Sequence, residues 1–213
     1  PEIFNGKRVY SQRLIGFTIQ DSIVSAAQIS ATPSSSYIEN VTTEEILEDG
    51  ATAAIKNILG RLKKADQYRI SIPSSLIIFK ELTVPFLDSD KIRMVIEYEV
   101  EALLPFSLNN ALIDFIITKQ DPKEKKSELL VAAVREQDLQ SIYKSYIDAG
   151  IEPANITVDL FSLYGLYKQI PEYTSLPEGS ALVEMGPSTI RVAFLLNGQL
   201  RLIRTIQKGL NTT

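Results

Sequence analysis

The side chains available for chemistry in this chain are carboxylates, lysines and hydroxyls, because its 213 residues include no histidine and no cysteine. Without histidine the chain lacks the usual general base near neutral pH, the Ser-His-Asp triad and imidazole ligands for a metal. Without cysteine it lacks a disulfide framework, a thiolate nucleophile and thiolate zinc sites, a composition that fits a reducing compartment. Most hydrolase mechanisms are therefore excluded, and any catalysis would rest on the remaining groups or on a metal carried by a nucleotide.

Two acidic segments have the residue types of a metal site but not its spacing. Glu97, Glu99 and Glu101 stand two apart on an expected helix, which spreads them around the helix and predicts a solvated face. Asp88 and Asp90 begin like a calcium loop, but no glycine or distal glutamate follows in register, so helix capping is the better interpretation. Neither segment predicts a bound metal.

The sequence also lacks the common signatures of nucleotide, nucleic-acid and membrane binding. It contains no Walker lysine loop and no dinucleotide glycine fingerprint. A net charge of -4 gives no overall positive field, and no local basic patch is present, so we expect no nucleic-acid partner. No apolar run approaches the roughly 20 residues that span a bilayer, and the start has no basic-then-apolar signal pattern, so we expect no membrane span and no export.

The elements that would position any site begin with three strands, a helix and a strand. Alternating apolar residues predict the strands, and apolar residues spaced by three and four predict the helix. The expected strands are 13–20, 23–29, 37–42 and 68–73, with the helix at 46–64 and a further strand or extended segment at 76–84.

A second group of elements has the order helix, strand, strand, helix, which predicts a small α+β subdomain. The last helix is expected to end at Gly150, in the position of a left-handed terminator. The expected elements are helix 90–104, strands 111–117 and 128–134, and helix 137–149.

The remainder of the chain partly repeats the opening. Asn197-Gly198 between two apolar runs is the strongest hairpin signal in the sequence. The expected elements are strand 155–158, helix 159–170, loop 171–179, and strands 180–185, 189–196 and 200–207. The repeated hairpin and third strand predict the start of a second, related domain.

We therefore expect an α/β fold in four segments: residues 1–84 as a first subdomain, 85–151 as an inserted α+β subdomain, 152–178 as the return to the first subdomain, and 179–213 as the opening strands of a second domain. This plan resembles the actin-like (ribonuclease H-like) ATPase superfamily, whose two halves each begin with an antiparallel hairpin that cradles phosphate.

Several stretches are similar, in order and spacing, to a narrower group within that superfamily. This group is the pilus-assembly protein PilM and the related type II secretion protein L (GspL), with the cell-division protein FtsA more distantly. The stretches are Leu82-Thr-Val-Pro-Phe86, Glu97 to Phe106 with Asp114 after it, Leu130 to Glu136, Asp148 to Pro153 leading into Val158 to Ser162, and Val183 to Gly186 with Arg204 to Gly209. The resemblance covers nearly the whole chain and implies that the family continues through the rest of a second domain.

The resemblance places a first phosphate-binding turn at residues 16–22. Nucleotide-binding members read Gly-Leu-Asp-Ile-Gly-Ser-Ser there; the aspartate orders water around the nucleotide's magnesium, and the glycine lets backbone amides approach the phosphates. Here Thr18 stands at the aspartate, Gln20 at the glycine, and Asp21 and Ser22 complete the turn. A hydroxyl is a poor substitute for a carboxylate near a doubly charged metal, so this turn is expected to be degenerate.

The second phosphate-binding turn keeps more of the family's pattern. Glu184 and Gly186 supply a carboxylate and a glycine, and Ser188 and Thr189 supply hydroxyls. An ordinary strand-end carboxylate and a turn glycine remain the alternative interpretation.

The family resemblance implies a scaffold at the cytoplasmic face of the inner membrane that links a pilus or secretion ATPase to inner-membrane platform proteins, without catalysis or a resident cofactor. The alternative is an actin-like ATPase or nucleotide-gated switch that binds ATP and magnesium in its full-length form. A homodimer of the full protein is also open. For partner contact we single out Pro105, Phe106 and Leu108, with a place in the core as the alternative.

Overall fold

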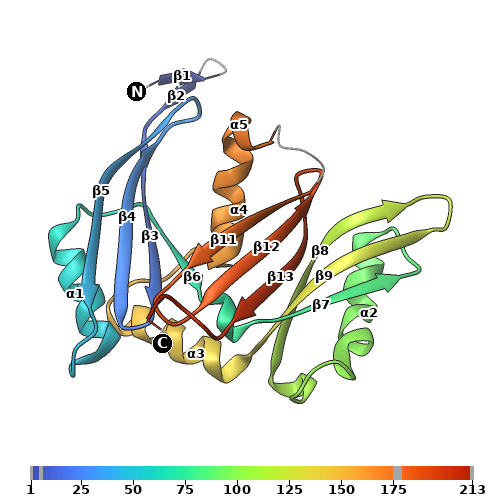
Figure 1. Cartoon of the computed structure of the whole chain (residues 1–213). Coiled ribbons are helices and arrows are strands. Elements are labelled where there is room, and N and C mark those ends of the chain that lie inside the picture. Colours follow the sequence, from blue (N-terminus) through green and yellow to red (C-terminus); the bar gives the residue numbers. More distant parts are fainter. Residues whose placement is uncertain (1, 5–6, 175–178, 212–213) are drawn as a thin grey trace. The chain divides into compact units, whose positions relative to one another are not determined.

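The computed structural model describes residues 2–4, 7–174 and 179–211 (Figure 1). The chain divides into two compact units, one of residues 1–73 and 140–159 and the other of residues 74–139 and 160–213. Each unit is described by itself.

The first unit is built on a five-stranded sheet with the strand order β10-β6-β3-β4-β5. Strands β3, β4 and β5 run antiparallel to one another, whereas β6 runs parallel to β3 and β10 parallel to β6. The bounds are β3 Gln12–Gln20, β4 Ile23–Ala31, β5 Ser36–Glu45, β6 Gln67–Ile72 and β10 Asn155–Val158. A separate small hairpin, β1 Glu2–Phe4 with β2 Lys7–Val9, precedes the sheet.

The core of the first unit lies on one face of this sheet. Ile15 and Phe17 of β3 are buried there, and side chains alternate between faces, so Thr18 lies on the opposite face, here called the outer face. Two helices supply the covering residues: α1 (Gly50–Arg61) with Ile55 and Ile58, and α3 (Glu136–Asp148) with Tyr146.

The second unit contains a three-stranded antiparallel sheet with the order β7-β9-β8. Its bounds are β7 Ile78–Val84, β8 Ala111–Asp121 and β9 Lys126–Arg135, with short 3-10 helices at Ser74–Leu76 and Leu108–Asn110. Helix α2 (Ser89–Glu101) covers one face of this sheet, where Ile92, Ile96 and Val100 pack against Leu129 and Val131 of β9.

The same unit contains a second three-stranded antiparallel sheet, ordered β11-β12-β13. Its bounds are β11 Gly179–Met185, β12 Ile190–Leu196 and β13 Gln199–Ile206, and the helices before it are α4 Asp159–Gln169 and α5 Pro171–Thr174. Leu160 and Tyr167 of α4 pack against Ala193, Leu195 and Ile203 of this sheet, and Leu130 of β9 joins the same cluster.

Most expected elements are present, and two turn signals are confirmed in detail. Asn197 and Gly198 have φ of 51° and 71°, as a tight hairpin of this type requires, and Gly150 has φ of 85° after α3. β11, β12 and β13 repeat the antiparallel order of β3, β4 and β5. The predicted α/β fold class, with its repeated three-strand meander, is therefore present.

Several expected elements differ in extent or placement. Helix α5 lies in the expected loop 171–179, and β8 extends four residues beyond the expected end at 117. The helix predicted from residue 46 begins at Gly50, because Ile46 packs against the core from an extended lead-in. The helix predicted to reach residue 104 ends at Glu101. Residues 76–84, expected to follow the strands of the first unit, form β7, which pairs with β9. Helix α3, expected in the second group of elements, places Tyr146 in the core of the first unit. The expected domain boundaries themselves remain predictions.

Candidate functional site

The first turn of the phosphate-binding pattern is the tight connection between β3 and β4. Gln20 pairs with Ile23, and Asp21 occupies the turn with φ of 53°, a left-handed conformation that an aspartate tolerates better than most residues. Asp21 and Ser22 are exposed and Gln20 is half-buried. The turn therefore carries a side chain, Gln20, at the position where the family pattern has a glycine, and an acidic residue, Asp21, directly after it.

Thr18, at the position of the metal-ordering aspartate, takes part in the sheet instead. It pairs with Ser71 of β6 in parallel register, and Ser71 Oγ donates a hydrogen bond to Thr18 Oγ1 at 3.1 Å. A hydroxyl carries no charge, and this one already accepts a bond from its neighbour. Thr18 is thus poorly suited to hold the water shell of a doubly charged metal.

The surroundings of the first turn are acidic. A shallow hollow beside it is lined by Ser22, Ile23, Thr43, Glu44, Glu45 and Leu47. Ile46 N donates to Ser22 O at 2.7 Å and so fixes this segment against the turn. The hydrogen bonds from Asn57 and Arg61 hold the pKa of Glu44 below its ordinary value, so that carboxylate stays charged. Arg61 forms an ion pair with this carboxylate, so Glu44 already has a counter-charge and offers no position for the metal of a nucleotide.

The second turn joins β11 to β12, and its carboxylate is already neutralised. Glu184 lies opposite Arg191 in the hairpin register, and Arg191 Nη1 donates to Glu184 Oε1 at 3.1 Å. The Arg191 side chain is only 3% exposed, against 30% for Glu184. A buried guanidinium needs a counter-charge, so this pair ties the carboxylate to the sheet.

The backbone of the second turn is closed by the segment that follows β13. Gly186 N donates to Thr189 O at 2.8 Å, Leu210 N donates to Gly186 O at 3.0 Å, and Asn211 N donates to Pro187 O at 3.0 Å. A Cβ on Gly209 would lie 2.2 Å from Pro187 O, closer than any side chain permits. The turn is therefore braced from within its own unit.

The other predicted residues of the second turn differ in exposure. Ser188 is exposed, whereas Gly186 and Thr189 are buried. Thr189 Oγ1 is inaccessible and has no hydrogen-bond partner within the part of the chain that the structure describes. The structure thus groups the four residues of each turn within one unit: Thr18, Gln20, Asp21 and Ser22 in the first, and Glu184, Gly186, Ser188 and Thr189 in the second.

Sequence reasoning missed Arg191 and Gly209. The signal for Arg191 was present, because a turn at residues 186–189 places residue 191 opposite residue 184 by simple counting along the hairpin. The signal for Gly209 was only its residue type, since no local pattern shows which distant backbone approaches it.

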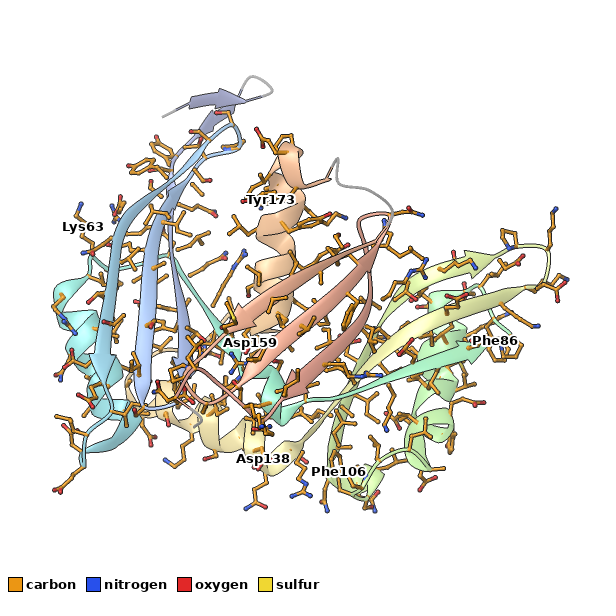
Figure 2. The ribbon with its side chains drawn as sticks, in the orientation of Figure 1. Lys63, Phe86, Phe106, Asp138, Asp159 and Tyr173 are labelled. Atoms are coloured by element: carbon orange, nitrogen blue, oxygen red, sulfur yellow. The ribbon has the colours of Figure 1, made fainter. Side chains whose placement is uncertain are left out.

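The three residues singled out for partner contact have unequal exposure. Pro105 is exposed, Phe106 is half-buried, and Leu108 packs against the cluster that α2 forms on its sheet. Figure 2 labels Phe106, and the Arg135 guanidinium lies over its ring at 5.2 Å from the centroid. A contact role for this segment stays a prediction.

Within the described residues no group of three or more His, Cys, Asp or Glu side chains could hold a metal ion. Over the same ranges, no helix is both long and apolar enough to cross a membrane.

Each unit contains an antiparallel three-strand meander, β3-β4-β5 in the first and β11-β12-β13 in the second, and parallel strands β6 and β10 complete the sheet of the first. This is an actin-like ATPase fold. A family model described as type IV pilus assembly protein PilM matches residues 20–212, and the chain belongs to this family.

Solved structures share the fold at low identity. The chain is similar to one titled "PilM-PilN type IV pilus biogenesis complex", with a TM-score of 0.76, 17% identity, 92% of this chain covered and 62% of that one. It is also similar to the cytoplasmic domain of EpsL, an inner membrane component of the type II secretion system of Vibrio cholerae, with a TM-score of 0.63, 10% identity and coverage of 92% and 71%. A third similar structure is a Bacteroides thetaiotaomicron protein with an actin-like ATPase fold, with a TM-score of 0.53 and 12% identity. The match covers 93% of this chain and 71% of that one. No match was found among curated protein sequences.

Proposed function

We propose that this chain is an assembly module of a type IV pilus inner-membrane platform that links the pilus ATPase to platform proteins and does not itself hydrolyse nucleotide. In this role the chain would lie at the cytoplasmic face of the inner membrane. Membership of the PilM family supports the pilus role, and likeness to the EpsL cytoplasmic domain supports a role next to the inner membrane.

The observation that carries the non-catalytic part is the state of the two turns. In the first, an uncharged hydroxyl bonded to Ser71 replaces the metal-ordering carboxylate, and Asp21 occupies the turn. In the second, the carboxylate of Glu184 is held by buried Arg191. A magnesium-bound triphosphate needs carboxylates for the metal's water and free backbone amides for the phosphates. Neither turn offers both.

Nucleotide titration tests this part directly. A ligand that binds the native state raises the free energy of unfolding, by about 2.7 kcal/mol when its concentration is 100 times Kd. We expect the melting temperature with ATP and magnesium to match that with magnesium and an equal concentration of inorganic triphosphate. A rise specific to ATP that disappears in Glu184→Ala and Ser22→Ala variants would establish the nucleotide-switch alternative instead.

The linking part is tested with purified components. The pilus ATPase and the cytoplasmic segments of the platform proteins of the same system are mixed with this chain, and binding is measured by calorimetry in the presence and absence of ATP. We expect binding of at least one component from each side with no dependence of its affinity on ATP. Failure of both components to bind would remove the linking role and leave the conclusion on nucleotide untouched.

A further inference from the structure

Strand β5 is a long edge strand whose outer side is open. It ends the order β10-β6-β3-β4-β5 and pairs only with β4 among the described residues. Three of its large side chains are mostly exposed: Tyr37 at 61%, Ile38 at 64% and Val41 at 63%. An exposed, apolar edge of this kind is a template for pairing with another strand.

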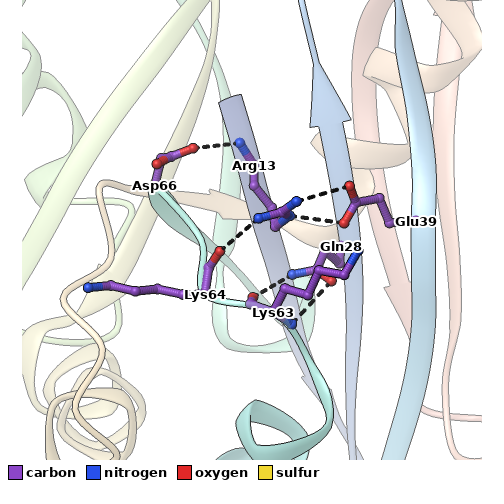
Figure 3. Close-up of polar contacts among 6 residues, drawn as sticks. All are labelled: Arg13, Gln28, Glu39, Lys63, Lys64 and Asp66. Carbon is purple, nitrogen blue, oxygen red and sulfur yellow. Dashed lines mark hydrogen bonds and ion pairs between the residues drawn. The ribbon is translucent and has the colours of Figure 1, made fainter. Parts of the chain in front are cut away.

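The shape of this edge is fixed by contacts on its inner side (Figure 3). The pairing of β5 with β4 shifts at Gln28 and Ile29, which leaves Glu39 as the extra residue of a bulge. Arg13 donates to both carboxylate oxygens of Glu39, from Nε at 2.9 Å and from Nη2 at 3.3 Å. The bulge is therefore anchored, and the outward-facing groups of β5 are held in place.

The charge pattern along β5 favours one kind of partner. Its carboxylates Glu44 and Glu45 lie at one end, and its hydroxyl residues Ser36 and Tyr37 lie at the other. An antiparallel copy of the same strand brings each acidic end opposite the other strand's hydroxyl end. Parallel pairing of the same strand would instead place like charges side by side, which is unfavourable.

We propose that β5 is the interface with a second copy of this chain, paired antiparallel about a two-fold axis at Val41. In this register Val41 faces the partner's Val41 and Thr43 faces the partner's Ile38, all on the outer face, with the bulge at Glu39 taking up the extra residue. Glu45 then faces the partner's Ser36, whose hydroxyl can donate to that carboxylate. Glu44, which Asn57 and Arg61 already hold, faces the partner's Tyr37. The result is one continuous sheet across two copies, with the self-complementary contact that a two-fold axis requires.

The absence of native cysteine makes this register directly testable. Residues directly opposite in an antiparallel pair have Cβ atoms about 4.5–5.5 Å apart, within reach of a disulfide once the side chains adjust. We expect Val41→Cys to form a disulfide-linked dimer under mild oxidation at native pH. Met94→Cys is the matched control, because Met94 is a still more exposed apolar residue, on α2; we expect it to remain monomeric.

A second measurement does not depend on cross-linking. We expect sedimentation velocity of the unmodified chain to show a concentration-dependent dimer, and Val41→Lys to weaken it at least about tenfold because two lysines would face each other. Met94→Lys should leave the dimer unchanged, and circular dichroism confirms that both variants fold. A monomer at all concentrations, or cross-linking of the two cysteine variants at equal rates, would overturn the proposal; binding of an extended peptide to a monomeric chain would assign the edge to a different protein.

Discussion

Glu184 Oε1 accepts a hydrogen bond at 3.1 Å from Nη1 of Arg191, whose side chain is almost wholly buried. The carboxylate that sequence comparison assigns to a nucleotide's metal shell therefore has a structural partner. Removing a carboxylate that stabilises a buried cation lowers the folding stability. Removing a carboxylate that serves only to bind a ligand usually does not.

Replacing the Glu184 carboxylate distinguishes a structural role beside Arg191 from a role in binding a nucleotide's metal. We expect Glu184→Ala to lower the free energy of unfolding by about 1–2 kcal/mol, since it removes a hydrogen-bonded carboxylate beside a buried guanidinium, while partial exposure of Glu184 moderates the effect. Arg191→Met should cost less, because it removes the charge that needs a partner. Urea unfolding measures both, and a Glu184→Ala loss below about 0.5 kcal/mol would contradict the structural role.

Gly209 provides a local test of how the second turn is braced. A Cβ at this position meets the Pro187 backbone, so Gly209→Ala must push the 208–211 segment away. We expect faster amide hydrogen exchange at Leu210 and Asn211, whose N–H groups donate to Gly186 O and Pro187 O. Global stability should change by less than about 1 kcal/mol, because the residues of this segment are mostly exposed.

Gly60 is the matched control for this substitution. It lies within helix α1, and a Cβ added there meets nothing within 4 Å. Gly60→Ala should raise stability by about 0.5–1 kcal/mol through helix propensity and leave exchange at Leu210 and Asn211 unchanged. Equal exchange rates at those two amides in the wild type and Gly209→Ala would show that the turn is not braced as described.

Features set by local chemistry were predictable from the sequence. Gly150 and Asn197-Gly198 marked a helix end and a hairpin correctly, because left-handed backbone limits the residues that fit. The partner of β7 was not predictable, because an apolar strand carries no mark of which sheet it joins. The start of α1 was misplaced because Ile46 is apolar for tertiary reasons and fits a helical pattern by chance.

In the candidate site, too, local features were predictable from the sequence and contacts between distant elements were not. Alignment with the family pattern was enough to assign the residue types of the two turns. The same alignment showed that the carboxylate is lost at Thr18. The hydrogen bond from Ser71 to Thr18 depends on the parallel register of β3 and β6, which local patterns do not specify. Contacts across elements were therefore the part that required coordinates.

Tyr146 is a test of an unsatisfied polar group in the core of the first unit. Its ring is fully buried and lies edge-to-face against Phe17, with centroids 5.8 Å apart, and its hydroxyl has no hydrogen-bond partner within the described ranges. Burial raises the pKa of this hydroxyl, so it remains neutral. We expect Tyr146→Phe to raise stability by about 1 kcal/mol, because it removes an unpaired group and keeps the ring. Tyr146→Leu, which loses the ring contact, should be less stable than Tyr146→Phe, and thermal unfolding ranks the two.

The Arg13–Glu39 ion pair predicts how the stability of the first unit varies with pH. The hydrogen bond from Arg13 holds the pKa of Glu39 below its ordinary value, with partial burial opposing it and the charges of Arg13 and Lys63 adding to it. The hydrogen bond to Glu39 also raises the pKa of Arg13, which stays charged throughout. A carboxylate with a lowered folded-state pKa contributes stability in full above the unfolded-state pKa, about 4.3, and loses that contribution as the pH falls through the folded value.

Substitution by glutamine isolates this contribution. We expect the difference in urea midpoint between the wild type and Glu39→Gln to be constant from about pH 6 to 8 and to shrink steadily below about pH 4, as Glu39 becomes protonated in the wild type. Glu152→Gln, an exposed glutamate of the same unit, is the control and should show no such trend. A difference between wild type and Glu39→Gln that stays constant down to pH 2 would mean that the bulge in β5 is held by packing rather than by its ion pair with Arg13.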